Sequence, residues 1–86
     1  MNKKVFSEDE WKILKSFREC GSSYIVRDYD GRLLVFKSVP EKKVWNGGLC
    51  WCAEGRFFEP KYMDYLFQNI SFEDGEPVSL YEYVGF

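Results

Sequence analysis

The chain has 86 residues, of which 45% are hydrophobic, 20% aromatic and 30% charged, and its formal net charge is −2. This length predicts one small domain over residues 1–86, and the aromatic rings can supply its core without metal or disulfide support. The composition excludes a disordered chain, and the absence of a long apolar run excludes a membrane span and a signal peptide, so we expect a cytoplasmic protein.

The net charge conceals a difference between the two halves of the chain. Residues 1–43 carry ten Lys or Arg and seven Asp or Glu, whereas residues 44–86 carry two and seven. Affinity for phosphate comes from clustered cations, so the composition disfavours nucleic acid as a partner. An acidic C-terminal half suits a basic protein surface, although an ordinary solvated surface has the same composition.

The first predicted element is a helix over residues 8–19. Ser7 and Glu10 have the spacing of a capping box, in which each side chain accepts a hydrogen bond from a backbone N–H near the other. Three acidic residues then occupy the first turn, where the helix dipole favours negative charge. Apolar residues recur on one face, and Gly21 is a natural stop for the helix.

A β-hairpin follows, with strand-like residues 24–27 and 32–37 on either side of an Asp-Gly pair. A two-residue loop would pair Asp28 with Leu33. A three-residue loop places Gly31 in the left-handed position of a bulge and Asp28 opposite Arg32, an attractive pair. We prefer the second register because it also aligns four apolar side chains on one face: Tyr24, Val26, Leu34 and Phe36.

The remaining segments complete the predicted fold. We expect short strands at residues 43–45 and 49–53 around an Asn-Gly-Gly turn, and an extended segment at 56–59. Pro60 and apolar residues at helical spacing predict a second helix over 60–69. An acidic turn at 73–77 precedes one helical turn at 80–84. The fold class is therefore α+β, a two-layer domain whose antiparallel sheet of three or four strands has helices mainly on one face.

Catalysis and metal binding find little support in the sequence. The chain has no histidine, so it has no imidazole acid, base or nucleophile pair. Cys50 and Cys52 project to the same face of a strand, but zinc prefers four ligands and only Cys20 remains. Free cysteine is a common core residue, so we expect three reduced thiols, no metal, no cofactor and no enzymatic activity.

Surplus aromatic residues near acidic ones are the residual indication of a binding function. Binding hot spots are enriched in Trp and Tyr, and acidic residues around them speed encounter with a basic surface. Most of these rings could equally belong to the core of so small a domain. The candidate partner-binding residues are Trp51, Glu73, Asp74, Glu76, Tyr81, Glu82, Tyr83 and Phe86.

Two segments carry a resemblance to a known family. Residues 24–33 match a hairpin motif, Trp/Tyr-Ile-Ala/Val-Arg-Asp-x-Asp-Gly-x-Leu, and residues 66–77 match Leu-Phe-x-x-Ile-x-Trp/Phe-Glu-Asp-x-Glu-Pro. Together they resemble a small, largely uncharacterised family of phage and prophage proteins of low-GC Gram-positive bacteria. The Cys-Trp-Cys strand within residues 41–60 departs from the family pattern, and the motifs are structural, so no functional residue is carried over.

The resemblance implies a context. Small phage accessory proteins often act on host machinery by binding, including as inhibitors of CRISPR nucleases. The leading hypothesis is therefore a non-enzymatic phage or prophage accessory protein that binds a host protein, such as a defence nuclease, as an anti-CRISPR-like inhibitor. The alternatives are a sponge for a nucleotide signal, which needs a deep polar pocket, and an accessory factor of phage replication.

Overall fold

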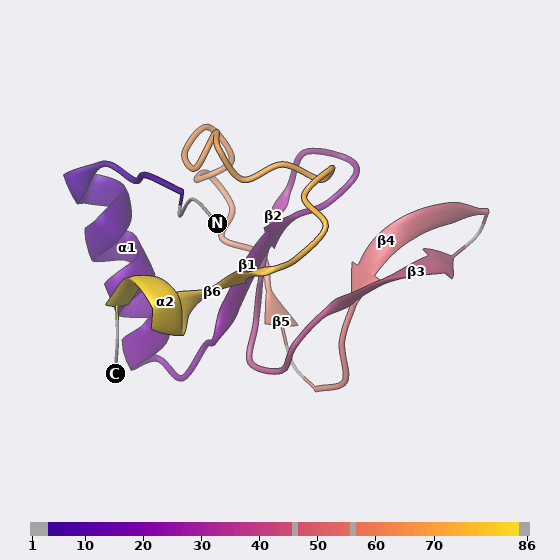
Figure 1. The fold of residues 1–86 in the computed structure, drawn as a ribbon, viewed down its shortest axis with the longest axis horizontal. Helices are drawn as coiled ribbons and strands as arrows, with labels where there is room; N and C mark the ends of the chain where they lie inside the picture. The colour runs from indigo at the N-terminus through magenta and orange to yellow at the C-terminus, as the bar shows by residue number, and fades with distance from the viewer. Residues whose placement is uncertain (1–3, 46, 56, 85–86) are drawn as a thin grey trace.

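The structure, a computed structural model, describes residues 4–45, 47–55 and 57–84. Four strands form an antiparallel sheet in the order β5-β2-β1-β6, and β3 and β4 form a separate antiparallel hairpin that projects from it (Figure 1). The predicted α+β fold is confirmed. In chain order the elements are α1 (Glu8–Glu19), β1 (Tyr24–Arg27), β2 (Leu33–Phe36), β3 (Glu41–Trp45), β4 (Gly48–Cys52), β5 (Phe57–Phe58), β6 (Val78–Ser79) and α2 (Leu80–Val84).

Helix α1 begins and ends at the predicted residues. The Ser7 side chain accepts from the Glu10 N–H at 3.2 Å, and the Glu10 carboxylate accepts from the Ser7 N–H at 2.9 Å, so the capping box is complete. At the other end Gly21 adopts a positive φ of 92°, and the Ser22 N–H donates to the Phe17 carbonyl at 3.0 Å. This closing pattern caps the last carbonyls of the helix.

The β1–β2 hairpin has the preferred register with a three-residue loop. Arg27 pairs with Leu33, and the Asp28 N–H donates to the Arg32 carbonyl at 2.8 Å. Gly31 has a φ of 88°, the left-handed conformation that this loop requires. The loop geometry and the alternation of apolar residues therefore fix the register, as predicted.

The predicted attraction between the side chains of Asp28 and Arg32 is wrong, because these two groups do not form an ion pair. The Arg32 guanidinium instead forms ion pairs with Asp30 at 2.6 Å and Glu59 at 3.0 Å. These two carboxylates raise the pKa of Arg32, the hydrogen bond from Asp30 contributing most. Asp28 is 6% exposed, and its Oδ1 accepts from the backbone N–H of Trp51 at 3.4 Å and not from Arg32.

Replacing Gly31 by alanine is expected to lower the free energy of unfolding by on the order of 1 kcal/mol, because a residue with a Cβ resists the left-handed conformation. The added Cβ meets no atom within 4 Å, so the cost comes from the backbone alone. Chemical denaturation measures it. Gly75→Ala is the matched control, since its backbone is outside the left-handed region; equal stability of the two variants would contradict the bulge.

The two faces of the sheet are buried against different parts of the chain. One face, with helix α1 and α2 beside it, holds the main core (Figure 1). The other face carries Val26, Leu34 and Phe36, as the preferred register predicts, and Trp51 of β4 covers it. The main core consists of Leu14, Phe17, Ile25, Leu33, Val35, Phe67, Ile70, Val78 and Leu80.

The predicted second helix over residues 60–69 is wrong. This segment is a series of turns, in which the Met63 N–H donates to the Pro60 carbonyl and the Leu66 N–H to the Met63 carbonyl. Tyr62 and Phe67 have positive φ values of 71° and 57°, which a right-handed helix excludes. The apolar spacing was real, since Phe67 and Ile70 are buried, but tertiary contacts override the helical pattern.

Arg27 of β1 is the main cause of that override. Its side chain is 9% exposed and donates five hydrogen bonds, all to backbone carbonyl oxygens. Burial lowers the pKa of the guanidinium, while the Asp64 carboxylate opposes this effect, and the group remains charged. The acceptors are Gly31 at 2.8 Å, Asp64 at 2.9 Å, Leu66 at 2.8 Å, Phe67 at 2.9 Å and Ile70 at 3.1 Å.

Glu10 holds the same segment from the side of α1. Besides capping the helix, its carboxylate accepts from the backbone N–H of Phe67. Burial would raise the pKa of Glu10, but the hydrogen bonds from Ser7 and Phe67 outweigh it, so the pKa lies below its ordinary value. The N–H and the C=O of Phe67 are thus both bound by charged side chains, which fixes its unusual backbone conformation.

Candidate functional site

The structure places the predicted partner-binding residues in three groups. The first is the acidic turn, where Glu73 and Glu76 are exposed. Asp74 is partly buried instead, since its carboxylate pairs with Lys4 at 3.0 Å and accepts from the Ser71 N–H at 3.1 Å. Asp74 therefore shapes the turn, and Glu73 and Glu76 are its accessible charges.

The second group lies on α2, which forms where one terminal helical turn was predicted. Tyr81 is 49% exposed and lies beneath the Arg18 guanidinium, 4.0 Å from the ring centroid. Tyr83 packs edge-on against Phe6 with 5.0 Å between centroids, and its hydroxyl accepts from the Lys4 N–H at 2.8 Å. Lys4 thus links Tyr83 to the acidic turn. Glu82 is exposed, and Phe86 lies outside the described residues.

Trp51 forms the third group alone. Its ring is 6% exposed and belongs to the core cluster with Val26, Leu34 and Phe36. Its Nε1 is buried without a hydrogen-bond partner in the part of the chain that the structure describes. Trp51 therefore anchors the β3–β4 hairpin to the core and is not available to a partner. A binding surface on this hairpin has to come from its exposed residues.

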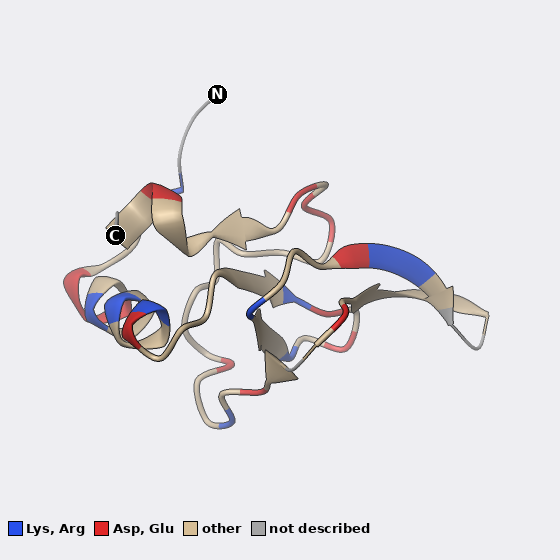
Figure 2. Cartoon of the chain, turned by 90° about the horizontal axis from the view of Figure 1, so that it is seen from below, with Lys and Arg blue, Asp and Glu red and all other residues tan. Residues whose placement is uncertain are grey.

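The charge difference between the two halves of the chain does not persist in space. Basic residues of the first half pair with acids of the second, as in Lys4–Asp74 and Arg32–Glu59. Lys42 donates to the carbonyl of Phe72, beside the acidic turn. Figure 2 shows both signs along α1 and on β3 as well. Electrostatic recognition therefore has to come from local groups, not from an acidic half.

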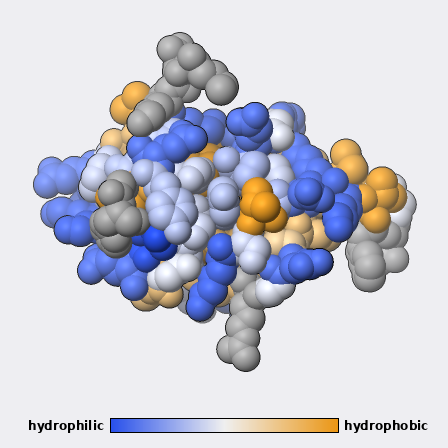
Figure 3. Space-filling model, turned by 60° about the horizontal axis from the view of Figure 1, so that its bottom comes forward, coloured by the Kyte–Doolittle hydropathy of each residue, from blue (hydrophilic) through white to orange (hydrophobic). Residues whose placement is uncertain are grey.

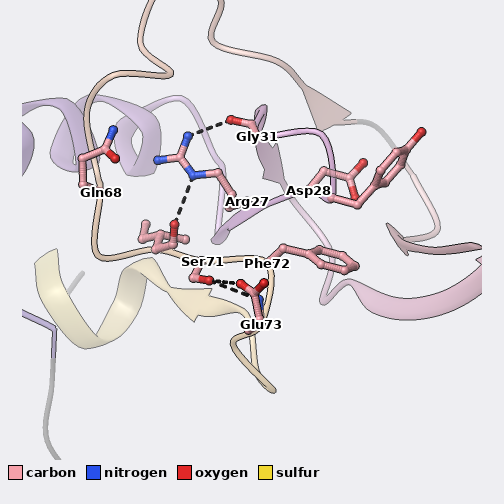
Figure 4. Close-up of a pocket in the computed structure, with 9 residues that line it drawn as sticks. Arg27, Asp28, Gly31, Gln68, Ser71, Phe72 and Glu73 are labelled. Carbon is pink, nitrogen blue, oxygen red and sulfur yellow. Dashed lines mark hydrogen bonds between the residues drawn. The ribbon is translucent and has the colours of Figure 1, made fainter.

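A local hollow of about 280 Å³ adjoins the acidic turn. It lies between the tip of the β1–β2 hairpin and the segment after Ile70 (Figure 4). Tyr29, which is 66% exposed, and Phe72 face each other edge to face across 6.4 Å. The hollow thus combines aromatic walls with charged groups. Its lining residues are Arg27, Asp28, Tyr29, Gly31, Gln68, Ile70, Ser71, Phe72 and Glu73.

Hydrogen-bond donors in this hollow are largely engaged, whereas acceptors remain. All five N–H groups of Arg27 donate to carbonyls, and the Gln68 amide donates to the carbonyls of Asp64 and Tyr65. Asp28 Oδ1 accepts a long hydrogen bond of 3.4 Å from the backbone N–H of Trp51. Among the described residues its second oxygen has no partner.

Glu73 adds a second carboxylate at the rim. One of its oxygens accepts from the Ser71 hydroxyl, and the Ser71 Oγ accepts in turn from the Glu73 N–H at 3.2 Å. The hydroxyl is the main cause that lowers the pKa of Glu73. Glu73 is therefore ionised at neutral pH, and among the described residues its other oxygen has no hydrogen-bond donor from another side chain.

The β3–β4 hairpin extends one apolar face away from the core. Lys42 pairs with Trp51 and Val44 with Leu49, and alternation along the strands places these four side chains on the same side. Val44 is 72% exposed and Leu49 49%. Figure 3 shows apolar residues at the outer end of the molecule, where this hairpin lies. We call Val44 and Leu49 the hairpin tip.

The cysteines lie elsewhere. Cys50 and Cys52 share the opposite face of β4, as predicted, with 3.4 Å between their sulfur atoms. Their mutual hydrogen bond is the main cause that raises the pKa of Cys50, followed by burial. Cys20 is exposed at the end of α1. No three metal-ligating side chains gather within the described ranges, and the reduced, metal-free state stays a prediction.

Sequence reasoning missed the residues that complete the hollow and the hairpin tip. Asp28 was predicted to lie opposite Arg32, Tyr29 to lie in the three-residue loop, and Val44 and Leu49 to lie in short strands. One pattern in the sequence could have indicated the hairpin tip: Val44 and Leu49 are apolar and face each other across the predicted turn. In the structure no third strand pairs with β3 or β4 among the described residues to cover them. The burial of Asp28 depends on the distant Trp51, so no local pattern could have shown it.

Comparison with protein-family profiles, curated proteins and solved structures gave no match for this chain. The class that the fold and the site define is therefore an α+β domain with a projecting apolar hairpin beside a hollow rich in acceptors. In the described part of the chain, neither helix has the length and apolarity needed to cross a membrane.

Proposed function

We propose that this chain is a non-enzymatic accessory protein of phage or prophage origin that binds a host protein. Its target in this proposal is a component of a host defence system, such as a CRISPR nuclease, and its action is inhibition by binding. The observation that carries the proposal is the uncovered apolar face of the β3–β4 hairpin. The phage context rests on the family resemblance of the two motifs.

The hairpin tip has the properties of a docking element. Its two apolar side chains are exposed although they continue the face on which Trp51 is buried. Burying an aliphatic side chain stabilises an association by roughly 1.5–3 kcal/mol, before the cost of ordering the partners. The ladder of β3 and β4 keeps both residues in place, so little conformational entropy is lost on binding.

The base of the hairpin adjoins the hollow. Lys42, at the base of the hairpin, has its Nζ 5.2 Å from the centroid of Trp51 and 4.4 Å from that of Phe72. The backbone N–H of Trp51 also donates to the carboxylate of Asp28, which lines the hollow. A partner that covers the tip can therefore reach the hollow, and Glu73 of the acidic turn lies at its rim.

Affinity capture from lysates of a low-GC Gram-positive host tests this function. The baits are wild type, Val44→Ser/Leu49→Ser, and the matched control Val5→Ser/Val39→Ser, whose valines are 85% and 55% exposed outside the hairpin. We expect wild type and control to retain the same host protein, and the hairpin variant to retain at least tenfold less. All three should show similar melting temperatures.

Two results would contradict the proposal. One is capture of a nucleotide or of DNA in place of a protein. The other is equal retention by the hairpin variant, which would show that the uncovered tip does not dock a partner. The anti-defence part is tested by the identity of the captured protein, which should be a nuclease or another component of a defence system.

A further inference from the structure

We propose that the hollow beside Asp28 receives a positively charged side chain, a lysine ammonium or an arginine guanidinium, of the partner protein. This inference rests on the proposed protein-binding function and names the chemical group that the site recognises. It follows from the state of Asp28, from the engaged donors around it and from the aromatic walls of the hollow.

Asp28 presents one carboxylate oxygen that is open to the hollow. It is 6% exposed and lines the hollow, while its side chain accepts only the 3.4 Å hydrogen bond from Trp51 among the described residues. Among the described residues, Trp51 Nε1 is the one buried side-chain polar atom without a partner, so the second oxygen of Asp28 reaches solvent and can accept a hydrogen bond from an incoming donor. The hollow is the route by which such a donor can arrive (Figure 4).

The surrounding groups favour a donor over an acceptor. The five N–H groups of Arg27 and the side-chain amide of Gln68 already donate to carbonyls. A phosphate or carboxylate entering the hollow would find none of these side-chain donors available. An ammonium or guanidinium would instead meet the free oxygens of Asp28 and Glu73, which form strong charge-assisted hydrogen bonds.

The aromatic rings add a second attraction. Cations within about 6 Å of a ring centroid are stabilised by its electron-rich face. Phe72 already engages Lys42 in this way, with 4.4 Å between Nζ and the centroid. Tyr29 stands 6.4 Å from Phe72 and is largely exposed, so its ring is available to an incoming cation.

Two positive charges, Arg27 and Lys42, also lie close to the hollow and balance the charges of Asp28 and Glu73. Lys42 donates to the Phe72 carbonyl, so both cations have partners of their own. The expected recognition is therefore short-ranged, through hydrogen bonds and ring contacts, and not through a strong net field. The volume of about 280 Å³ suits the end of one side chain better than a whole nucleotide.

An NMR titration of the ¹⁵N-labelled protein tests this without the partner. The probes are N-acetyl-arginine amide, N-acetyl-lysine amide and the neutral N-acetyl-citrulline amide, at matched chloride concentration. We expect both cationic amides to shift the amide signals of residues 28–31 and 71–73, and citrulline to bind at least tenfold more weakly.

Three variants separate recognition from folding. Asp28→Asn and Tyr29→Ala are each expected to reduce binding of the cationic amides at least fivefold with the remaining spectrum unchanged. If Asp28→Asn does not fold, Tyr29→Ala still tests the inference, because Tyr29 is 66% exposed and its replacement should not affect folding. Glu54→Gln removes an exposed carboxylate outside the hollow and should have no effect.

The inference is overturned if neither cationic amide shifts these signals, if citrulline binds equally, or if the shifts lie outside the hollow. Such a failure is distinguishable from failure of the proposed function. Loss of the cation site would leave capture through the hairpin tip intact, whereas capture of no protein would leave the titration result standing.

Discussion

Replacing Arg27 by alanine is expected to lower the free energy of unfolding by on the order of 3–5 kcal/mol, the cost of breaking a buried, charged hydrogen-bond network. The variant leaves five carbonyl oxygens without their donor, four of them in residues 64–70. That segment has no helix or strand of its own to satisfy them. Urea denaturation followed by tryptophan fluorescence measures the loss.

Two further variants sharpen this prediction. Arg27→Lys keeps the charge but cannot reproduce the planar fork of five donors, so we expect it to recover only a minor part of the loss. Arg32→Ala is the matched control, because Arg32 forms its two ion pairs with a side chain that is 47% exposed, so its loss should lower the stability far less than the loss of Arg27. If Arg27→Ala were as stable as Arg32→Ala, this would contradict the conclusion that the hydrogen bonds of Arg27 hold residues 64–70 in place.

Replacing Glu10 by glutamine is expected to cost about 2 kcal/mol at pH 7, since charged acceptors form stronger hydrogen bonds than neutral ones. The carboxylate joins the start of α1 to the backbone of Phe67. Glu8→Gln is the control, because the exposed Glu8 forms a long 3.7 Å ion pair with Lys12 on the surface of the same helix. Chemical denaturation of both variants at pH 7 gives the comparison.

The same carboxylate predicts a dependence on pH. The pKa of Glu10 is lower in the folded protein than its ordinary value. The stabilisation is therefore complete above the unfolded pKa of roughly 4.3 and is lost as the pH falls through the folded pKa. The difference in stability between wild type and Glu10→Gln should shrink as the pH falls below about 5. A difference that stays constant down to pH 3 would contradict this linkage.

Elements governed by neighbouring residues were predictable from the sequence. The capping box of α1 and the bulge at Gly31 depend on residues within one turn, and both form as expected. The segment at 60–69 was not predictable because its conformation depends on Arg27, which is 37 to 40 residues away from its acceptors there. Apolar spacing showed which residues are buried but not which backbone they adopt.

Arg27 also explains why two separate motifs stand out in the sequence. It belongs to the hairpin motif at 24–33, and three of its acceptors, Leu66, Phe67 and Ile70, belong to the motif at 66–77. The motifs are therefore two halves of one structural unit. Glu73 of the second motif was predicted as a binding residue, whereas Asp28 of the first was missed because its burial arises only when the fold is complete.

The most direct test of the binding account is hydrogen–deuterium exchange of the captured complex against the free protein. The account predicts slower exchange in β3, in β4 and at residues 28–31 and 71–73, because the partner covers both the hairpin and the adjoining hollow. Exchange in α1 should be unchanged. Protection confined to α1 and α2, with none on the hairpin or around Asp28, would contradict it.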